Sequence, residues 1–150
     1  MIMDKTGAKI VLSTFWRKWK RYIAYVLSRY GIDPKSIVDI TPGRGHIKKE
    51  VAPIIYESRS AEILAWLSMN GFPRSFVILD DREYAGLGVL KSRFILTGSD
   101  VGITNEQAGQ ALKILQLPCK KDDPVAKWLE VNGAPKPHSC KTIEGKERIE

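Results

Sequence analysis

Ser13, Thr14 and Arg17 are the first residues of the chain whose types and spacing suggest binding of an anion. The two hydroxyl residues follow the apolar run KIVL, and Arg17 lies one helical turn beyond them. A hydroxyl beside the backbone amides at the start of a helix is suited to holding a phosphate oxygen. The same residues also suit a plain helix N-cap. The pattern therefore leaves two interpretations open, a phosphate cradle and a structural cap.

Asp80 and Asp81 form a second group, directly after the apolar run SFVIL. Adjacent carboxylates are costly to bury unless a cation pairs with them, and Mg²⁺ prefers oxygen ligands of this kind. The alternative is a pair of acids in a solvent-exposed loop. Arg59 begins the amphipathic segment that precedes this run. Its guanidinium is able to bridge a phosphate or to pair with Glu62 on its own helix.

The tetrad Asp4-Lys5-Thr6-Gly7 looks like a loop in which an aspartate carries a phosphoryl group. To lie beside Ser13 at one edge of a parallel sheet, Asp4 would need a crossover connection of at least about 10–12 residues. Only the four residues from Lys5 to Ala8 separate Asp4 from the apolar run. A nucleophile role for Asp4 is therefore not expected.

The elements that must position these side chains follow from apolar periodicity. The expected strands are 9–13, 36–40, 75–79 and 93–97, and the expected helices are 16–30, 58–69 and 104–115. An apolar stripe on the first helix is expected to face the core: Trp16, Trp19, Ile23, Val26, Leu27 and Tyr30. Ser58 is the expected N-cap of the second helix, and Thr104 to Gln107 form a capping box for the third. This order predicts an α/β fold with a largely parallel sheet.

The domain organisation follows from where this pattern ends. Residues 1–117 are expected to form the α/β domain, and residues 118–150 a polar tail in which prolines and charges interrupt any periodicity. Within this tail, residues 125–131 suit one or two helical turns. At 150 residues the whole chain has the length of one domain.

The net charge of +7 lies in the first part of the chain. Residues 1–60 contain 12 Lys and Arg against 5 Asp and Glu, whereas residues 61–150 contain 12 of each kind. A basic patch would favour a polyanion such as nucleic acid or a phosphorylated substrate, although a solvated helix face has the same composition. No apolar run has the length of a membrane span. Without a signal-peptide pattern or a disulfide framework, we expect an intracellular, cytoplasmic protein with no membrane partner.

Two further groupings are weaker. Cys119, His138 and Cys140 supply three zinc-ligand types, but they lack a nearby fourth and their spacing fits no standard zinc motif. His46 follows Gly45 in a turn-rich segment, where a solvated loop histidine is the simpler interpretation. Neither grouping is expected to be a functional site.

Four segments together resemble the haloacid dehalogenase-like (HAD) domain of Swiss Army Knife RNA repair proteins. They are AKIVLSTFWRKW, ESRSAEILAWLSMNG, SFVILDDREY and FILTGSDVGITNEQAGQALKIL, in order between residues 6 and 116. The resemblance implies a Rossmann-like, mostly parallel sheet flanked by helices. It also implies a Mg²⁺-dependent phosphohydrolase that acts on a phosphorylated substrate, with RNA ends as the substrate class.

The same resemblance implies a role for each residue singled out above. The phosphate-binding positions are Ser13, Thr14, Arg17 and Arg59. Asp80 and Asp81 occupy the acidic motif that holds Mg²⁺. Thr14 and Phe15 stand where the extended second motif has serines, which is a local departure from the family pattern.

A larger departure is that the family's first motif is absent. In the family an apolar strand ends in Asp-x-Asp-Gly and its first aspartate is the nucleophile, and this sequence contains no such segment. No catalytic residue is therefore identified. By this resemblance, KTGAKIVLS corresponds to the end of the family's first helix and the second strand that follows it. We thus expect an N-terminally truncated domain that lacks its first strand and helix.

The missing strand would lie centrally in the family sheet, between the strands that carry the second and fourth motifs. Its loss should leave a gap there or force the two strands to pair directly. Two functions follow from this expectation. One is a phosphohydrolase whose nucleophile segment must be supplied, and the other is a phosphate- or nucleic-acid-binding module or fragment without turnover.

Overall fold

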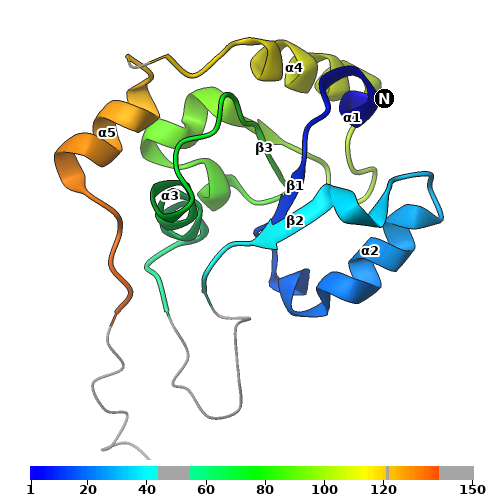
Figure 1. Cartoon of the computed structure of the whole chain (residues 1–150), viewed down its shortest axis with the longest axis horizontal. Coiled ribbons are helices and arrows are strands. Elements are labelled where there is room, and N and C mark those ends of the chain that lie inside the picture. The colour runs from blue at the N-terminus through cyan, green and yellow to red at the C-terminus, as the bar shows by residue number, and fades with distance from the viewer. Residues whose placement is uncertain (44–54, 121, 139–150) are drawn as a thin grey trace, which may run out of the picture.

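The computed structural model describes residues 1–43, 55–120 and 122–138, in which short strands alternate with helices (Figure 1). The strands are β1 (Ile10–Leu12), β2 (Ile37–Ile40), β3 (Ile78–Asp80) and β4 (Phe94–Leu96). The α-helices are α1 (Ile2–Thr6), α2 (Lys20–Ser28), α3 (Arg59–Met69), α4 (Asn105–Gln116) and α5 (Pro124–Asn132). Short 3₁₀ helices connect them: η1 (Phe15–Trp19), η2 (Pro34–Ser36), η3 (Glu83–Gly86) and η4 (Gly88–Arg93).

The strands pair in parallel, β1 with β2 and β3 with β4, as the sequence predicted. In the described residues these pairs are two separate two-stranded sheets, so the single Rossmann-like sheet is not seen there. A continuous sheet would require a strand hydrogen-bonded to both β1 and β3, or direct pairing between them, and neither occurs in these residues. The mixture of helices and small parallel sheets is that of an α/β fold.

The starts of two helices agree with their sequence patterns. The Ser58 hydroxyl accepts a hydrogen bond from the backbone N–H of Ala61 and caps α3. At α4, Thr104 accepts from the N–H of Gln107 while the Gln107 side chain accepts from the N–H of Thr104. Both predicted caps are therefore confirmed, and local sequence alone determines where these helices begin.

The first predicted helix differs from expectation. Residues 15–19 form η1 and only residues 20–28 form the α-helix α2, none of whose residues is buried. The predicted buried stripe is wrong at Trp16, Trp19 and Tyr30, which are 57%, 41% and 80% exposed. The main contacts of α2 are with η1, η2 and β2, which lie close to it in the chain, and much of its surface meets solvent.

The hydrophobic core is centred on one face of α3. Ile63, Leu64 and Leu67 of this helix pack in one cluster with buried side chains from β3, η3 and η4. Val125 of α5 belongs to the same cluster and is 1% exposed. The helical turns predicted at 125–131 therefore exist as α5, and they are part of the core although they lie in the segment expected to be a polar tail.

Polar contacts join the first part of the chain to α3. Ile37 is the only buried hydrophobic residue among residues 1–43. From α3, the Trp66 indole N–H donates a hydrogen bond to the Asp39 carboxylate at 2.7 Å, and Glu62 forms an ion pair with Arg17. Figure 1 shows α1 against α4, and the two helices are in contact. No helix in the described part of the chain has the length and apolar character needed to cross a membrane.

Candidate functional site

A small pocket brings three of the predicted site residues together. Its volume is about 190 Å³. It is lined by Ser13, Phe15, Arg17, Tyr56, Ser58, Arg59, Glu62 and Tyr84. Ser13, Arg17 and Arg59 were predicted to meet here, whereas Thr14, Asp80 and Asp81 lie outside the pocket lining.

The pocket lies where strand ends and a helix start converge. Ser13 follows the carboxyl end of β1, and Ser58 and Arg59 form the start of α3. Asp80 is the last residue of β3 and reaches Arg59 from that strand end. The first backbone N–H groups of a helix and its positive dipole end favour an anion at this position.

Arg59 is held in place by Asp80 and an aromatic ring. Its Nη1 lies 2.5 Å from Asp80 Oδ2, and its guanidinium carbon lies 5.2 Å from the centre of the Tyr84 ring. The Asp80 side chain is fully buried, and its Oδ1 accepts a hydrogen bond from the Arg82 N–H. The alternative pairing of Arg59 with Glu62 is therefore wrong in this structure, because Glu62 pairs elsewhere.

Arg17 and Glu62 form a second, buried ion pair. Arg17 Nη1 lies 2.6 Å from Glu62 Oε2, and Arg17 Nη2 lies 3.0 Å from Glu62 Oε1. Nη1 also donates to the Thr41 hydroxyl and to the Ser13 carbonyl, each at 3.1 Å. The charge of Arg17 is thus balanced by Glu62 within the pocket wall. Its predicted phosphate-binding role stays a prediction.

Three hydroxyl groups complete the polar lining of the pocket: Ser13, Tyr56 and Ser58. Burial, and secondarily the negative charge of Glu62, raise the pKa of Tyr56 above its ordinary value of 10.0. The Tyr56 hydroxyl therefore keeps its proton at neutral pH and is a hydrogen-bond donor. Sequence reasoning missed Tyr56 and the role of Glu62, although both flank the predicted Ser58 cap and so lie near the helix start.

In this structure the acidic residues Asp80 and Asp81 both lie beside arginines. Both carboxylate oxygens of Asp80 are used, by Arg59 and by the Arg82 N–H. Asp81 is exposed, with an oxygen 3.9 Å from Arg82 Nε. Among the residues that the structure describes, no group of three His, Cys, Asp or Glu side chains converges on a metal position. The Mg²⁺-binding role of Asp80 and Asp81 stays a prediction.

The remaining candidates lie away from this pocket or outside the described residues. Asp4 is an exposed residue of α1, paired with the Met1 ammonium at 2.6 Å, and α1 ends at a left-handed Gly7. Residues 2–6 are therefore helical before the first strand, as the resemblance implied. His46 and Cys140 lie outside the described residues.

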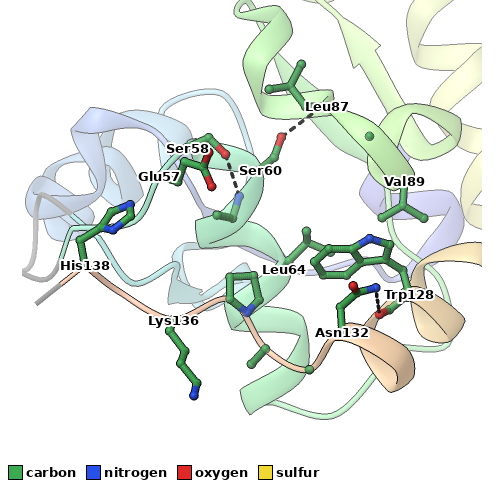
Figure 2. A pocket seen from close by; sticks show the side chains of 15 residues that line it. Glu57, Ser58, Ser60, Leu64, Leu87, Val89, Trp128, Asn132, Lys136 and His138 are labelled. Atoms are coloured by element: carbon green, nitrogen blue, oxygen red, sulfur yellow. Dashed lines mark hydrogen bonds between the residues drawn. The ribbon is translucent and has the colours of Figure 1, made fainter.

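A larger cavity of about 380 Å³ lies between the start of α3 and α5 (Figure 2). Trp128, Leu64 and Val89 give it an apolar wall, and Glu57 adds a negative charge. Lys136 extends away from the other labelled side chains in Figure 2. Ser58, Ser60, Asn132 and His138 also line this cavity. The smaller pocket is the better candidate site because it brings Ser13, Arg17 and Arg59 together.

Comparisons with curated proteins and with solved structures found no match. The family model for the HAD domain in Swiss Army Knife RNA repair proteins matches residues 1–108. This range covers well over half of the chain and includes every residue that lines the smaller pocket. The chain therefore belongs to the family of HAD domains found in Swiss Army Knife RNA repair proteins.

Proposed function

We propose that the smaller pocket binds the phosphate group at the end of a phosphorylated RNA strand. In this proposal the chain supplies phosphate recognition of the HAD phosphohydrolase type. The observation that carries the proposal is that Ser13 and Arg59, from separate segments, line one pocket together with the Tyr56 hydroxyl. Membership of a family of RNA repair domains supports RNA as the substrate class.

Recognition would rest on an arginine that is already oriented and on two hydroxyl groups beside it. The Ser13 and Tyr56 hydroxyls and the Arg59 nitrogens that Asp80 does not hold would donate to phosphate oxygens, and charge-assisted hydrogen bonds are the stronger kind. Asp80 and the Tyr84 ring restrain the Arg59 side chain. Because less side-chain freedom is lost on binding, this restraint favours affinity.

Binding without turnover is the form of the proposal that we favour for this chain. A carboxylate nucleophile must be free to attack phosphorus. The sequence contains no Asp-x-Asp-Gly segment, and the nearby carboxylates of Glu62 and Asp80 are each paired with an arginine. Phosphate release is the second candidate, and family membership is what favours it.

Fluorescence anisotropy with short RNA oligonucleotides tests the proposal. The same sequence is compared with a 5′-phosphate, with a 3′-phosphate and with hydroxyls at both ends. We expect one phosphorylated end to bind at least about tenfold more tightly than the hydroxyl form, since a hydrogen bond to a charged group contributes about 1.5–3 kcal/mol. Malachite-green detection of released phosphate separates binding from turnover.

Matched variants identify the pocket as the origin of this preference. Arg59→Gln should abolish it and Ser13→Ala should reduce it severalfold, while Arg74→Gln, which changes an exposed arginine outside the pocket, should leave it unchanged. Equal affinity of the wild-type protein for phosphorylated and hydroxyl ends would refute the proposal. Steady phosphate release that Arg59→Gln abolishes would replace binding alone with the phosphohydrolase function.

A further inference from the structure

The surface of η1 and α2 exposes an unusual number of aromatic side chains. Phe15, Trp16, Trp19, Tyr22 and Tyr25 are each between 41% and 61% exposed. The ring centres of Phe15 and Trp19 lie 6.3 Å apart, and those of Trp16 and Trp19 lie 5.2 Å apart. Three large rings therefore form one exposed group, which we call the aromatic platform: Phe15, Trp16 and Trp19.

Positive charge is interleaved with these rings. The Lys18 ammonium lies 4.5 Å from the centre of the Phe15 ring and 4.0 Å from that of Trp19. On α2, Arg21 and Arg29 are exposed together with Tyr22 and Tyr25. Tyr22, Tyr25 and the C-cap residue Arg29 are spaced along one face of α2, so a cation and aromatic rings share that face.

The charge of this segment has one sign. Residues 5–32 contain seven Lys and Arg and no Asp or Glu. Only Arg17 among the residues of η1 and α2 is buried, where Glu62 neutralises it. Lys18, Arg21 and Arg29 are exposed and Lys20 is partly exposed, so this surface is complementary to a polyanion.

The aromatic platform begins at the pocket. Phe15 lines the smaller pocket with Ser13, and it also contacts Trp19 edge to face. A strand whose terminal phosphate entered the pocket would therefore pass next to the exposed rings as it left. Proteins that bind single strands without sequence preference combine exposed aromatic rings with basic side chains, because every base has a planar face that can stack on a ring.

We propose that the aromatic platform and the exposed face of α2 bind single-stranded nucleic acid, with bases stacked on the rings and the backbone held by Lys18, Arg21 and Arg29. The inference rests on the proposed function in one respect, that the bound strand is the one whose end occupies the pocket. It adds that affinity arises along the strand and is higher for a single strand than for a duplex, whose bases already stack on each other.

The test uses oligonucleotides with hydroxyls at both ends, which bind this surface without a phosphate in the pocket. A strand of about 12 nucleotides is within the range of site sizes of single-strand-binding OB folds. We expect quenching of tryptophan fluorescence, and weaker binding of the blunt duplex of the same sequence. The slope of log affinity against log salt should be about −2, since about three cations contact the backbone of a single strand.

Variants that keep apolar character but remove the ring face separate stacking from protein docking. Phe15→Leu with Trp16→Leu should weaken single-strand binding at least fivefold, whereas Val131→Ala, at an exposed position on α5, should not change it. Lys18→Gln with Arg29→Gln should weaken binding and reduce the salt slope, whereas Lys113→Gln on α4 should do neither. Circular dichroism confirms that each variant is folded.

The failures of the two proposals are distinguishable. The surface proposal is overturned if hydroxyl-ended strands do not bind the wild-type protein, or if they bind the Phe15→Leu, Trp16→Leu variant as tightly as the wild type. This holds even if a phosphorylated end still binds the pocket. A loss of phosphate preference in Arg59→Gln with unchanged hydroxyl-strand binding would support both. Self-association that the leucine variant abolishes in sedimentation velocity, without nucleic acid binding, would assign the surface to a second copy of the chain and overturn the proposal.

Discussion

Gly43 has a structural role at the residue scale that its sequence context did not indicate. Its backbone φ of 137° is in the region that favours glycine. A Cβ atom at this position would come within 2.6 Å of Arg17 Nη2 and would also collide with the Glu62 carboxylate. The buried ion pair therefore leaves no space for a side chain here.

Replacing Gly43 by alanine should consequently destabilise the protein. We expect Gly43→Ala to lower the free energy of unfolding by about 2–4 kcal/mol, because overpacking and backbone strain add. Urea denaturation followed by circular dichroism measures the change. Gly109→Ala is the control, since a Cβ there meets nothing within 4 Å in the middle of α4 and should raise stability by about 0.5–1 kcal/mol. A neutral Gly43→Ala would contradict the described packing.

Asp80 competes with phosphate for Arg59 in the proposed site. Asp80→Asn removes that negative charge but retains an oxygen for the Arg82 N–H. We expect the variant to bind the phosphorylated oligonucleotide about three- to tenfold more tightly, because the loss of about 1 kcal/mol of electrostatic competition, a factor of roughly five, outweighs the loss of the restraint that Asp80 places on Arg59. Its stability should fall by about 1–3 kcal/mol because a charged hydrogen bond is lost.

The same variant tests the metal prediction. Binding is measured in EDTA and again with added Mg²⁺, and Asp81→Asn is the control at an exposed carboxylate. Tighter binding in both media is the result that our description of Asp80 predicts. If Asp80→Asn instead weakened binding only when Mg²⁺ is present, Asp80 would be a metal ligand and the counter-ion interpretation would be wrong.

At the scale of elements, sequence predicted those whose signals are local. The caps at Ser58 and Thr104 each need only three or four consecutive residues, and both helices begin where expected. The burial of α5 was not predicted, because the partners of Val125 are distant in the chain and the surrounding prolines and charges hide its apolar face. The exposure of α2 was missed for the same reason, since periodicity shows that an apolar face exists but not what covers it.

Asp123 connects α5 to the rest of the fold and makes that connection dependent on pH. Its Oδ1 caps α5 through the Val125 N–H at 2.9 Å, and its Oδ2 accepts from Arg93 Nη2 at 2.8 Å. Burial by itself raises the pKa of Asp123, but the hydrogen bonds from Arg93 and Val125 outweigh it and hold the pKa below its ordinary value. The stabilisation is therefore complete above the unfolded-state pKa of about 3.9 and is lost as pH falls through the folded-state pKa.

Asp123→Asn keeps a cap-forming residue while removing the charge. At pH 7 we expect the variant to be about 3 kcal/mol less stable, because it leaves the buried Arg93 without its counter-ion. The difference from wild type should shrink as the pH is lowered from 6 to 3 in urea titrations. Asp122→Asn, at a highly exposed carboxylate, should show no such difference. A gap between wild type and Asp123→Asn that is constant with pH would contradict this linkage.

At the scale of the whole molecule, the sequence could predict that the strands pair in parallel but not which strands pair or how the two pairs are joined. Strand order depends on contacts between distant segments, and so does the choice of ion-pair partners. Sequence proximity suggested Arg59 with Glu62, whereas the fold pairs Arg17 with Glu62 and Arg59 with Asp80. The predicted pocket residues Ser13 and Arg59 were found because both follow recognisable element boundaries.

Two side chains of α3, Glu62 and Trp66, hydrogen-bond to the segment that contains β1 and β2, and this gives the molecule a predictable weak point. Glu62 contacts Arg17 and Trp66 contacts Asp39, while the apolar face of α3 packs on the other side. Glu62→Gln should therefore loosen β1 and β2 before it affects β3, since local opening free energies differ across a structure. Hydrogen exchange by mass spectrometry should show at least about tenfold faster exchange in peptides covering residues 10–12 and 37–40, corresponding to about 1.4 kcal/mol.

The paired replacement makes this prediction sharper. Arg17→Met with Glu62→Leu removes both charges, and apolar substitution of a buried ion pair is often neutral, whereas removal of one partner costs about 3–5 kcal/mol. The double variant should thus restore much of the protection that Glu62→Gln loses, and Glu83→Gln, an exposed carboxylate on η3, should change nothing. Equal acceleration in the peptides of β1–β2 and of residues 59–69 would show instead that the molecule opens as one cooperative unit, with α3 anchoring both sheets equally.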